Sequence, residues 1–240
     1  METIFKTLLL IARPAAGKSE IINYLNNLDV NQRKQVYHIG KLDVIDDFEM
    51  LWTWFEEDKL LEKMGYPRLH TDADEYFIGN HLWDLLIERI SLEYQKRIRD
   101  INGYHNDHTT LIEFSRGKEH GGYKNAFNHL SDEILANLAI MYINVSWDES
   151  LRKNIKRFNP ERPDSILEHS LSLSKMEKLY KESDWFEIVK NTKNYIKIRN
   201  FPVPFTVFEN EDDVTSSPND TFAKRLKTNL NILWELYIKR

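Results

Sequence analysis

The chain has 240 residues, of which 41% are hydrophobic and 30% charged, as in a soluble globular protein with one sizeable core. Its formal net charge of −5 argues against nucleic acid as the main partner, because duplex-binding proteins usually carry a basic excess. The absence of cysteine excludes disulfides, thiolate metal sites and cysteine nucleophiles.

The apolar run at residues 8–12 is the longest near the N-terminus and is far too short to span a bilayer. The same region lacks the apolar core and small-residue cleavage site of a signal peptide. We therefore expect a cytoplasmic protein without a membrane partner. The sequence leaves the oligomeric state open.

Apolar runs of strand length alternate with segments of helical periodicity along the chain. In chain order we expect strand 6–12, helix 17–28, strand 36–39, helix 48–64, helix 80–101, strand 109–114, helix 131–138, strand 139–145, helix 148–157, helix 175–189, strand 205–209 and helix 221–239. The nearly continuous apolar character of the first strand is typical of parallel sheets. The alternation predicts an α/β protein with helices on both faces of the sheet.

The helix expected at 48–64 is rich in aromatic residues, and Asp46 or Asp47 is suited to cap its start. Trp52 and Phe55 share one stripe, and aromatic residues at helical spacing belong more often to a core than to a base-stacking surface. Trp54 lies off this stripe, so we expect it to be the more exposed tryptophan.

A P-loop pattern follows the first strand, with alanine in place of its first glycine: Ala12-Arg13-Pro14-Ala15-Ala16-Gly17-Lys18-Ser19. In such a loop, backbone N–H groups surround the β-phosphate, Lys18 reaches the β- and γ-phosphates, and the Ser19 hydroxyl binds Mg²⁺. The dipole of the following helix adds to the attraction. The alternative is a chance Gly-Lys-Ser in a strand-to-helix turn, but the strand before the motif and the helix after it favour phosphate binding.

The predicted nucleotide site comprises eight consecutive residues: Arg13, Pro14, Ala15, Ala16, Gly17, Lys18, Ser19 and Glu20. We expect ATP rather than GTP, because the chain has no guanine-specific Asn-Lys-x-Asp string. Ala12 is the weak point of the motif, since a positive φ at this position would cost about 1 kcal/mol.

With this motif, the order of elements resembles that of the P-loop nucleoside and nucleotide kinases, the adenylate-kinase-like group. The resemblance covers most of the chain, although only the P-loop matches as a motif. It implies a three-layer P-loop NTPase fold with a five-stranded, mostly parallel sheet of order 2-3-1-4-5. It also implies a single domain over 1–240, with a helical arm at about 47–108 that holds the acceptor and a basic lid at about 151–185.

The resemblance implies roles for residues after three of the strands. Glu113 would hold Mg²⁺ together with Ser19, and Arg116 would hold a phosphate, unless the two are simply a solvated charge pair at a strand end. Asp43 would accept the proton of the acceptor hydroxyl or orient a magnesium-bound water, with Asp46 and Asp47 as helix caps.

A basic segment after strand 139–145 would form the lid: Arg152, Lys153, Lys156, Arg157 and Arg162. Lys153 and Arg157 are four residues apart on a helix and so share a face. There they would stabilise the charge on the transferring phosphoryl oxygens. A solvated basic helix face is the alternative.

The sequence thus predicts an enzyme that transfers the γ-phosphate of Mg-ATP to a small-molecule acceptor. The alternative is an ATP-dependent switch, a weak ATPase or an inactive nucleotide-binding protein. The family's Asp-Gly-Phe-Pro-Arg string is represented only by residues 114–116, and the arm is longer and more aromatic than usual. These departures leave open whether the acceptor is a nucleoside, a nucleotide or another hydroxyl compound. The strand end at 205–209 with Asn210 loosely resembles an adenine contact.

Overall fold

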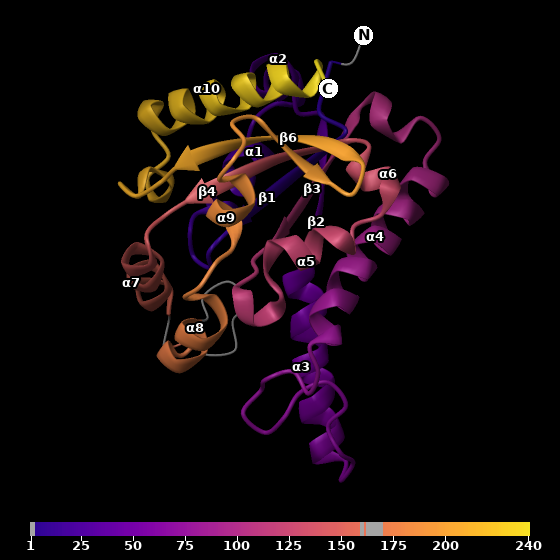
Figure 1. Ribbon diagram of the computed structural model, residues 1–240, viewed down its shortest axis with the longest axis vertical. Helices are drawn as coiled ribbons and strands as arrows, with labels where there is room; N and C mark the ends of the chain where they lie inside the picture. The colour runs from indigo at the N-terminus through magenta and orange to yellow at the C-terminus, as the bar shows by residue number, and fades with distance from the viewer. Residues whose placement is uncertain (1–2, 159–160, 162–169) are drawn as a thin grey trace.

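The computed structural model describes residues 3–158, 161 and 170–240. It is an α/β fold built on a six-stranded, mostly parallel sheet, as the alternation of elements predicts (Figure 1). The strand order is β2-β3-β1-β4-β6-β5. The strands are β1 (Thr7–Ala12), β2 (Lys41–Asp46), β3 (His108–Phe114), β4 (Leu138–Asn144), β5 (Tyr195–Ile198) and β6 (Phe201–Glu209).

The expected strand count and order were wrong because of one additional strand. Five strands in the order 2-3-1-4-5 were expected, but β5 pairs antiparallel with the first half of β6, from Tyr195 opposite Pro204 to Ile198 opposite Phe201. This short strand lies just before β6 in the chain, so a hairpin occupies the edge where one strand was expected.

The second strand was also misplaced. Residues 36–39 are not a strand, because Val36 and Tyr37 end helix α2 (Val30–Tyr37), which the sequence analysis missed. The Asp29 side chain starts this helix by accepting hydrogen bonds from the N–H groups of Asn31 and Gln32. The true second strand begins at Lys41, after His38 has turned the chain with a φ of 57°.

Helices cover both faces of the sheet, as Figure 1 shows. One face carries α1 (Lys18–Asn26), α2 and α10 (Asp220–Tyr237), and the other carries α4 (His81–Asp100), α5 (Gly122–Asn128), α6 (Asp132–Leu135) and α9 (Trp185–Val189). In β1, Leu8 and Leu10 join the first core, whereas Leu9 and Ile11 join the second. The continuous apolar run arises because both faces of the strand are buried.

Two further helices, α7 (Trp147–Arg157) and α8 (Leu173–Tyr180), belong to the expected lid. The helix expected at 175–189 is instead two helices, α8 and α9. Asp184, between them, uses its carboxylate to accept the N–H groups of Tyr123 and Lys124 and so caps α5. Residues 159–160 and 162–169 of the lid, including Arg162, lie outside the described residues.

Three 3-10 turns complete the elements: Tyr104–Asn106, Lys118–His120 and Val214–Ser216. Within the described ranges, no helix is long and apolar enough to cross a membrane.

The expected helical arm begins with α3 (Asp47–Lys63), which runs away from the sheet, and the chain then folds back along it toward α4 (Figure 1). The prediction for Trp54 was wrong, since it is only 4% exposed. It packs with Leu82, Trp83 and Leu86 of α4 and stacks on His70. Two different segments cover α3, so its buried surface is wider than one stripe.

Asp58, on α3, anchors the segment around residues 68–78, where the chain folds back along this helix; we call it the returning arm segment. Its fully buried carboxylate accepts the N–H groups of Leu69, His70 and Thr71 and the hydroxyl of Thr71. Burial by itself raises the pKa of Asp58, but these hydrogen bonds outweigh it and lower the pKa to about 2.

Replacing Asp58 with asparagine should therefore release the segment around residues 68–78. An amide cannot accept all four donors, and we expect a loss of about 3 kcal/mol in the free energy of unfolding, measured in urea. Because the pKa of Asp58 is lowered in the folded state, its contribution should be present above pH 4 and disappear as the pH falls toward 2.

The matched control is Glu62→Gln, which removes only an exposed partner of Arg68 and should cost less than about 1 kcal/mol. Equal effects of the two substitutions would contradict the assignment of Asp58 as the anchor of this segment.

Candidate functional site

A cleft of about 700 Å³ lies at the carboxyl ends of β2 and β3 and beside the turn that follows β1. In open α/β sheets, ligands bind at this edge. Seven of the residues predicted to form the nucleotide, metal or catalytic site line the cleft: Pro14, Ala15, Lys18, Ser19, Glu113, Arg116 and Arg157. Its remaining walls come from the start of α3, the returning arm segment and α8.

Three side chains from distant parts of the chain fix the loop between β1 and α1. The Tyr123 hydroxyl donates to the Ala12 carbonyl, the Ser150 hydroxyl to the Pro14 carbonyl, and the Asn210 amide to the Ala16 carbonyl, each at 2.8 Å. A planar trans peptide directs its N–H opposite to its C=O. These three carbonyls point toward the surrounding elements. The N–H group of the residue that follows each carbonyl therefore points away from those elements.

The sequence analysis considered a positive φ at Ala12, but the positive φ angles of this loop lie at other residues. Ala12 is the last residue of β1 and has no positive φ, so the missing first glycine causes no strain. The left-handed positions are Ala15, with a φ of 56°, and Gly17, with a φ of 111°. Such alternation of conformations makes a concave set of N–H groups suited to an anion.

The start of α1 brings the first polar groups into the cleft. Gly17 is the N-cap and makes no side-chain cap, and the first N–H groups of any helix lack partners within it. The Lys18 ammonium donates to the Ser115 hydroxyl at 2.8 Å, and Ser19 is exposed in the cleft. Glu20 lies in the first turn of α1 and is not among the lining residues.

Two carboxyl groups meet beside Lys18. Parallel pairing places Asp46, the last residue of β2, opposite Glu113 on β3. Burial and then the charges of Glu113 and Asp47 raise the pKa of Asp46 to about 8. Burial also raises the pKa of Glu113, although the Lys18 charge opposes this. Both shifts favour a proton or a cation between the two carboxyl groups, and a side-chain hydrogen bond joins Asp46 to Glu113.

Asp43 does not lie in the cleft, in contrast to the expected role as proton acceptor. It lies three residues before the end of β2, where it forms an ion pair with Arg97 and accepts the Tyr104 hydroxyl, both at 2.8 Å. Asp46, expected only to cap α3, does so by accepting the Phe48 N–H and also lines the cleft.

Arg116 reaches the cleft but is held by a neighbour. Arg116 is 3% exposed, and its guanidinium forms an ion pair with Asp47 at 2.6 Å and lies over the rings of Trp83 and Phe114. The Arg116–Asp47 pair connects the end of β3 to the start of α3. Because Asp47 follows directly after Asp46, the pair also fixes the position of the carboxyl pair.

The lid cations divide between two environments. Lys153 is buried and forms an ion pair with Asp213 at 2.6 Å, outside the residues that line the cleft. The side of α7 that faces the cleft carries Asn154 and Arg157 instead. The i,i+4 spacing of Lys153 and Arg157 was therefore misleading, because the loop after β6 provides a nearer partner for Lys153.

Arg13 and Asn210 hold the loop and make no part of the cleft wall. The Arg13 guanidinium donates to the carbonyls of Tyr180 and Lys181 at the end of α8, which joins the loop to the lid. Asn210 is fully buried between the loop and Thr215, so it is not an exposed contact for a base.

The sequence analysis did not foresee the aromatic wall of the cleft: Phe48, Trp52, Phe55, Tyr76, Phe77 and Trp83. Trp52 and Phe55 were assigned to a core, but both are half-buried and face the cleft. The density of aromatic residues on α3 was the available signal. The polar residues Arg68, His70 and Asp72 shape the returning segment, whereas its residues 75–77 line the cleft.

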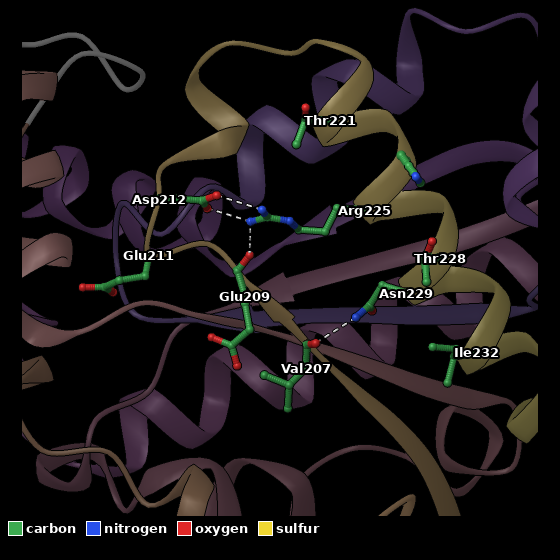
Figure 2. A pocket seen from close by; sticks show the side chains of 10 residues that line it. Val207, Glu209, Glu211, Asp212, Thr221, Arg225, Thr228, Asn229 and Ile232 are labelled. Atoms are coloured by element: carbon green, nitrogen blue, oxygen red, sulfur yellow. Dashed lines mark hydrogen bonds and ion pairs between the residues drawn. The ribbon is translucent and has the colours of Figure 1, made fainter.

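A second, shallower hollow of about 820 Å³ lies between β6 and α10. Figure 2 shows that several of its polar groups bind one another: Arg225 forms an ion pair with Asp212 and donates to the Glu209 carbonyl, and Asn229 donates to the Val207 carbonyl. These bonds protect the outer edge of β6.

Across the described part of the chain, no three or more His, Cys, Asp or Glu residues are grouped to hold a metal ion by themselves. A cation in the cleft would depend on the Asp46–Glu113 pair together with the Ser19 hydroxyl and ligand oxygens.

Comparisons with known proteins bear little on this site. No protein-family model matches the chain, and no curated protein sequence is similar to it. Among solved structures, the crystal structure of APE1195 aligns with 100% of this chain and 97% of its own, with 14% sequence identity and a TM-score of 0.39. A likeness at this level carries no argument about function, which must be inferred from the residues of the cleft.

The two left-handed positions of the loop should respond differently to substitution. A Cβ at Gly17 would come within 2.6 Å of the Thr215 hydroxyl and 2.8 Å of the Asn210 amide, so we expect Gly17→Ala to cost at least about 2 kcal/mol in urea unfolding. Ala15→Gly removes about 1 kcal/mol of backbone strain and adds a similar entropic cost, so its stability should stay within about 1 kcal/mol of the wild type. Similar losses in both variants would contradict this geometry.

Proposed function

We propose that the loop Ala12–Ser19 is a P-loop that binds the phosphates of ATP. The observation that carries this proposal is the fixing of the Ala12, Pro14 and Ala16 carbonyls by Tyr123, Ser150 and Asn210. The N–H groups between them are thereby directed away from these contacts, beside the Lys18 ammonium and the N-terminus of α1. This is the arrangement that a polyphosphate requires.

The cleft also suits a magnesium ion bound together with the nucleotide. Two neighbouring carboxyl groups with raised pKa values, Asp46 and Glu113, lie beside Lys18, and such a pair is costly unless a proton or a cation lies between the groups. Hard carboxylate and hydroxyl oxygens are the ligands that Mg²⁺ prefers. Asp46, Glu113 and the Ser19 hydroxyl would hold the ion, which neutralises phosphate charge when bound.

The protein is then best described as an ATP-dependent phosphotransferase with a small-molecule acceptor. Lys18 and Arg157 supply positive charge beside the phosphates, and the aromatic wall formed by α3 and the arm segment would bind the acceptor. Asp43 lies outside the cleft, so it is not placed to receive the proton of the acceptor hydroxyl. Asp46 lies inside the cleft as a proposed ligand of the metal ion, and the Arg116–Asp47 ion pair positions Asp46.

One observation favours the alternative, a nucleotide-binding protein that does not transfer phosphate. Arg116, which the kinase resemblance assigns to a phosphate, is buried in its ion pair with Asp47. The two functions differ in whether turnover of ATP requires an added acceptor. Stimulation of ADP formation by a nucleoside or nucleotide acceptor supports transfer, whereas acceptor-independent hydrolysis supports the alternative.

Binding of ATP should depend on Lys18. By calorimetry with Mg²⁺ present, we expect micromolar binding to the wild type and at least about a hundredfold loss in Lys18→Ala, because a charge-assisted phosphate contact is worth about 3 kcal/mol. Lys227→Ala, which removes an exposed lysine of α10, is the matched control and should bind normally. Equal binding by all three proteins would rule out the loop as the nucleotide site.

The Asp46–Glu113 pair should make magnesium binding depend on pH. Because the pKa of Asp46 is raised to about 8, its proton must leave before the ion binds. With ATP present, the Mg²⁺ affinity should rise by up to about tenfold per pH unit between pH 7 and 8 and then level off. Asp46→Asn should remove this rise, whereas Asp43→Asn, on the same strand but outside the cleft, should preserve it.

The same raised pKa has a predictable effect on stability. The folded state binds the Asp46 proton more tightly than the unfolded state, so this contribution to stability is complete below pH 4 and is lost as the pH rises through about 8. Asp46→Asn should therefore be more stable relative to the wild type at pH 9 than at pH 5. If the stability difference between Asp46→Asn and the wild type is the same at pH 5 and pH 9, the pKa of Asp46 is not raised in the folded state.

A further inference from the structure

Three lysines from two separate elements lie at the arm end of the cleft, and two of them pair with a single carboxylate. Glu75, on the returning arm segment, forms ion pairs with Lys59 of α3 at 3.4 Å and with Lys175 of α8 at 2.9 Å. Lys178, one turn further along α8, lies over the ring of Tyr76 at 4.1 Å. All five side chains line the cleft.

Glu75 occupies this place at a conformational cost. Its φ is 61°, in the left-handed region where a residue with a Cβ is strained. Burial would raise the pKa of Glu75, but Lys175 and Lys59 outweigh it and lower the pKa, so the group is held as an anion. A strained loop thus presents a carboxylate to a set of cations whose charge it only partly balances.

We propose that Lys59, Lys175 and Lys178 form a subsite for a phosphate group and that Glu75 occupies this subsite until the phosphate displaces it. The two lysines that pair with Glu75 share its single negative charge, and Lys178 follows Lys175 on α8, so a dianionic phosphate supplies charge that Glu75 alone does not. Lysine binds phosphate as a point charge on a flexible stem, so these side chains can follow the incoming anion.

The role of this subsite rests on the proposed function. If the protein is a phosphotransferase, the subsite indicates that its acceptor carries a phosphate group of its own. The site lies on the arm and on α8, whereas the proposed ATP site lies on the loop after β1. Displacing Glu75 would break the link between the arm segment and α8, so the acceptor's phosphate would take over the joining of these two walls of the cleft. An acceptor without a phosphate would leave Glu75 in place.

The test measures binding of inorganic phosphate by calorimetry in the full-length protein carrying Lys18→Ala, which weakens the proposed ATP site. In this background Glu75→Gln should tighten phosphate binding by about tenfold, since it removes the competing anion. Adding Lys175→Gln and Lys178→Gln should reverse the gain. The exposed Lys178→Gln alone provides a variant whose folding is not in question.

Two controls separate a specific subsite from a general change in charge. Glu177→Gln, on α8, removes an exposed carboxylate that pairs with Lys181, and Glu56→Gln removes another acid that lines the cleft. Phosphate affinity in these two variants should change by less than about twofold. An equal gain in Glu56→Gln or Glu177→Gln, or no gain in Glu75→Gln, would overturn the subsite.

The outcome is independent of the ATP site. A wild-type protein that fails to bind ATP, with phosphate binding that still responds to Glu75→Gln, would leave the subsite standing and remove the kinase proposal. Normal ATP binding with no response to Glu75→Gln would overturn the subsite alone.

Discussion

The structure of the cleft depends on how one loop is held. Tyr123, Ser150 and Asn210 come from α5, α7 and the loop after β6, and each uses one hydrogen bond to fix a carbonyl between β1 and α1. Since peptide N–H groups lie opposite these carbonyls, three separate elements together determine which way the N–H groups point. The polar surface beside Lys18 is therefore a property of the assembled fold and not of the local sequence alone.

The parallel sheet imposes the second constraint. It places the last residue of β2 opposite the strand end of β3, so that Asp46 and Glu113 meet in a buried place where both carboxyl groups cannot ionise without compensation. The ion pair between Arg116 and Asp47 fixes the residue next to Asp46 and so helps to hold this arrangement. Such unfavourable pairs persist at sites where a proton or a cation completes them, and the proposed magnesium site rests on this pair.

The sequence predicted those parts of the structure that arise from local patterns. The parallel α/β character follows from the buried run of β1, and the contribution of Lys18 and Ser19 to a cleft follows from the motif. Failures came from contacts between distant segments. Val36, Tyr37 and Ile39 are apolar because they pack against the core at the end of α2, and Lys153 turns to Asp213 because the loop after β6 lies beside it. No periodicity within one segment reports such neighbours.

The most direct test of this account is a crystal structure of the protein with Mg²⁺ and a non-hydrolysable ATP analogue. We predict that the β-phosphate lies against the backbone N–H groups between Ala15 and Ser19, with Mg²⁺ bound to the Ser19 hydroxyl and the carboxylates of Asp46 and Glu113. An analogue bound elsewhere, for instance in the hollow between β6 and α10, would contradict the assignment of the cleft as a nucleotide site.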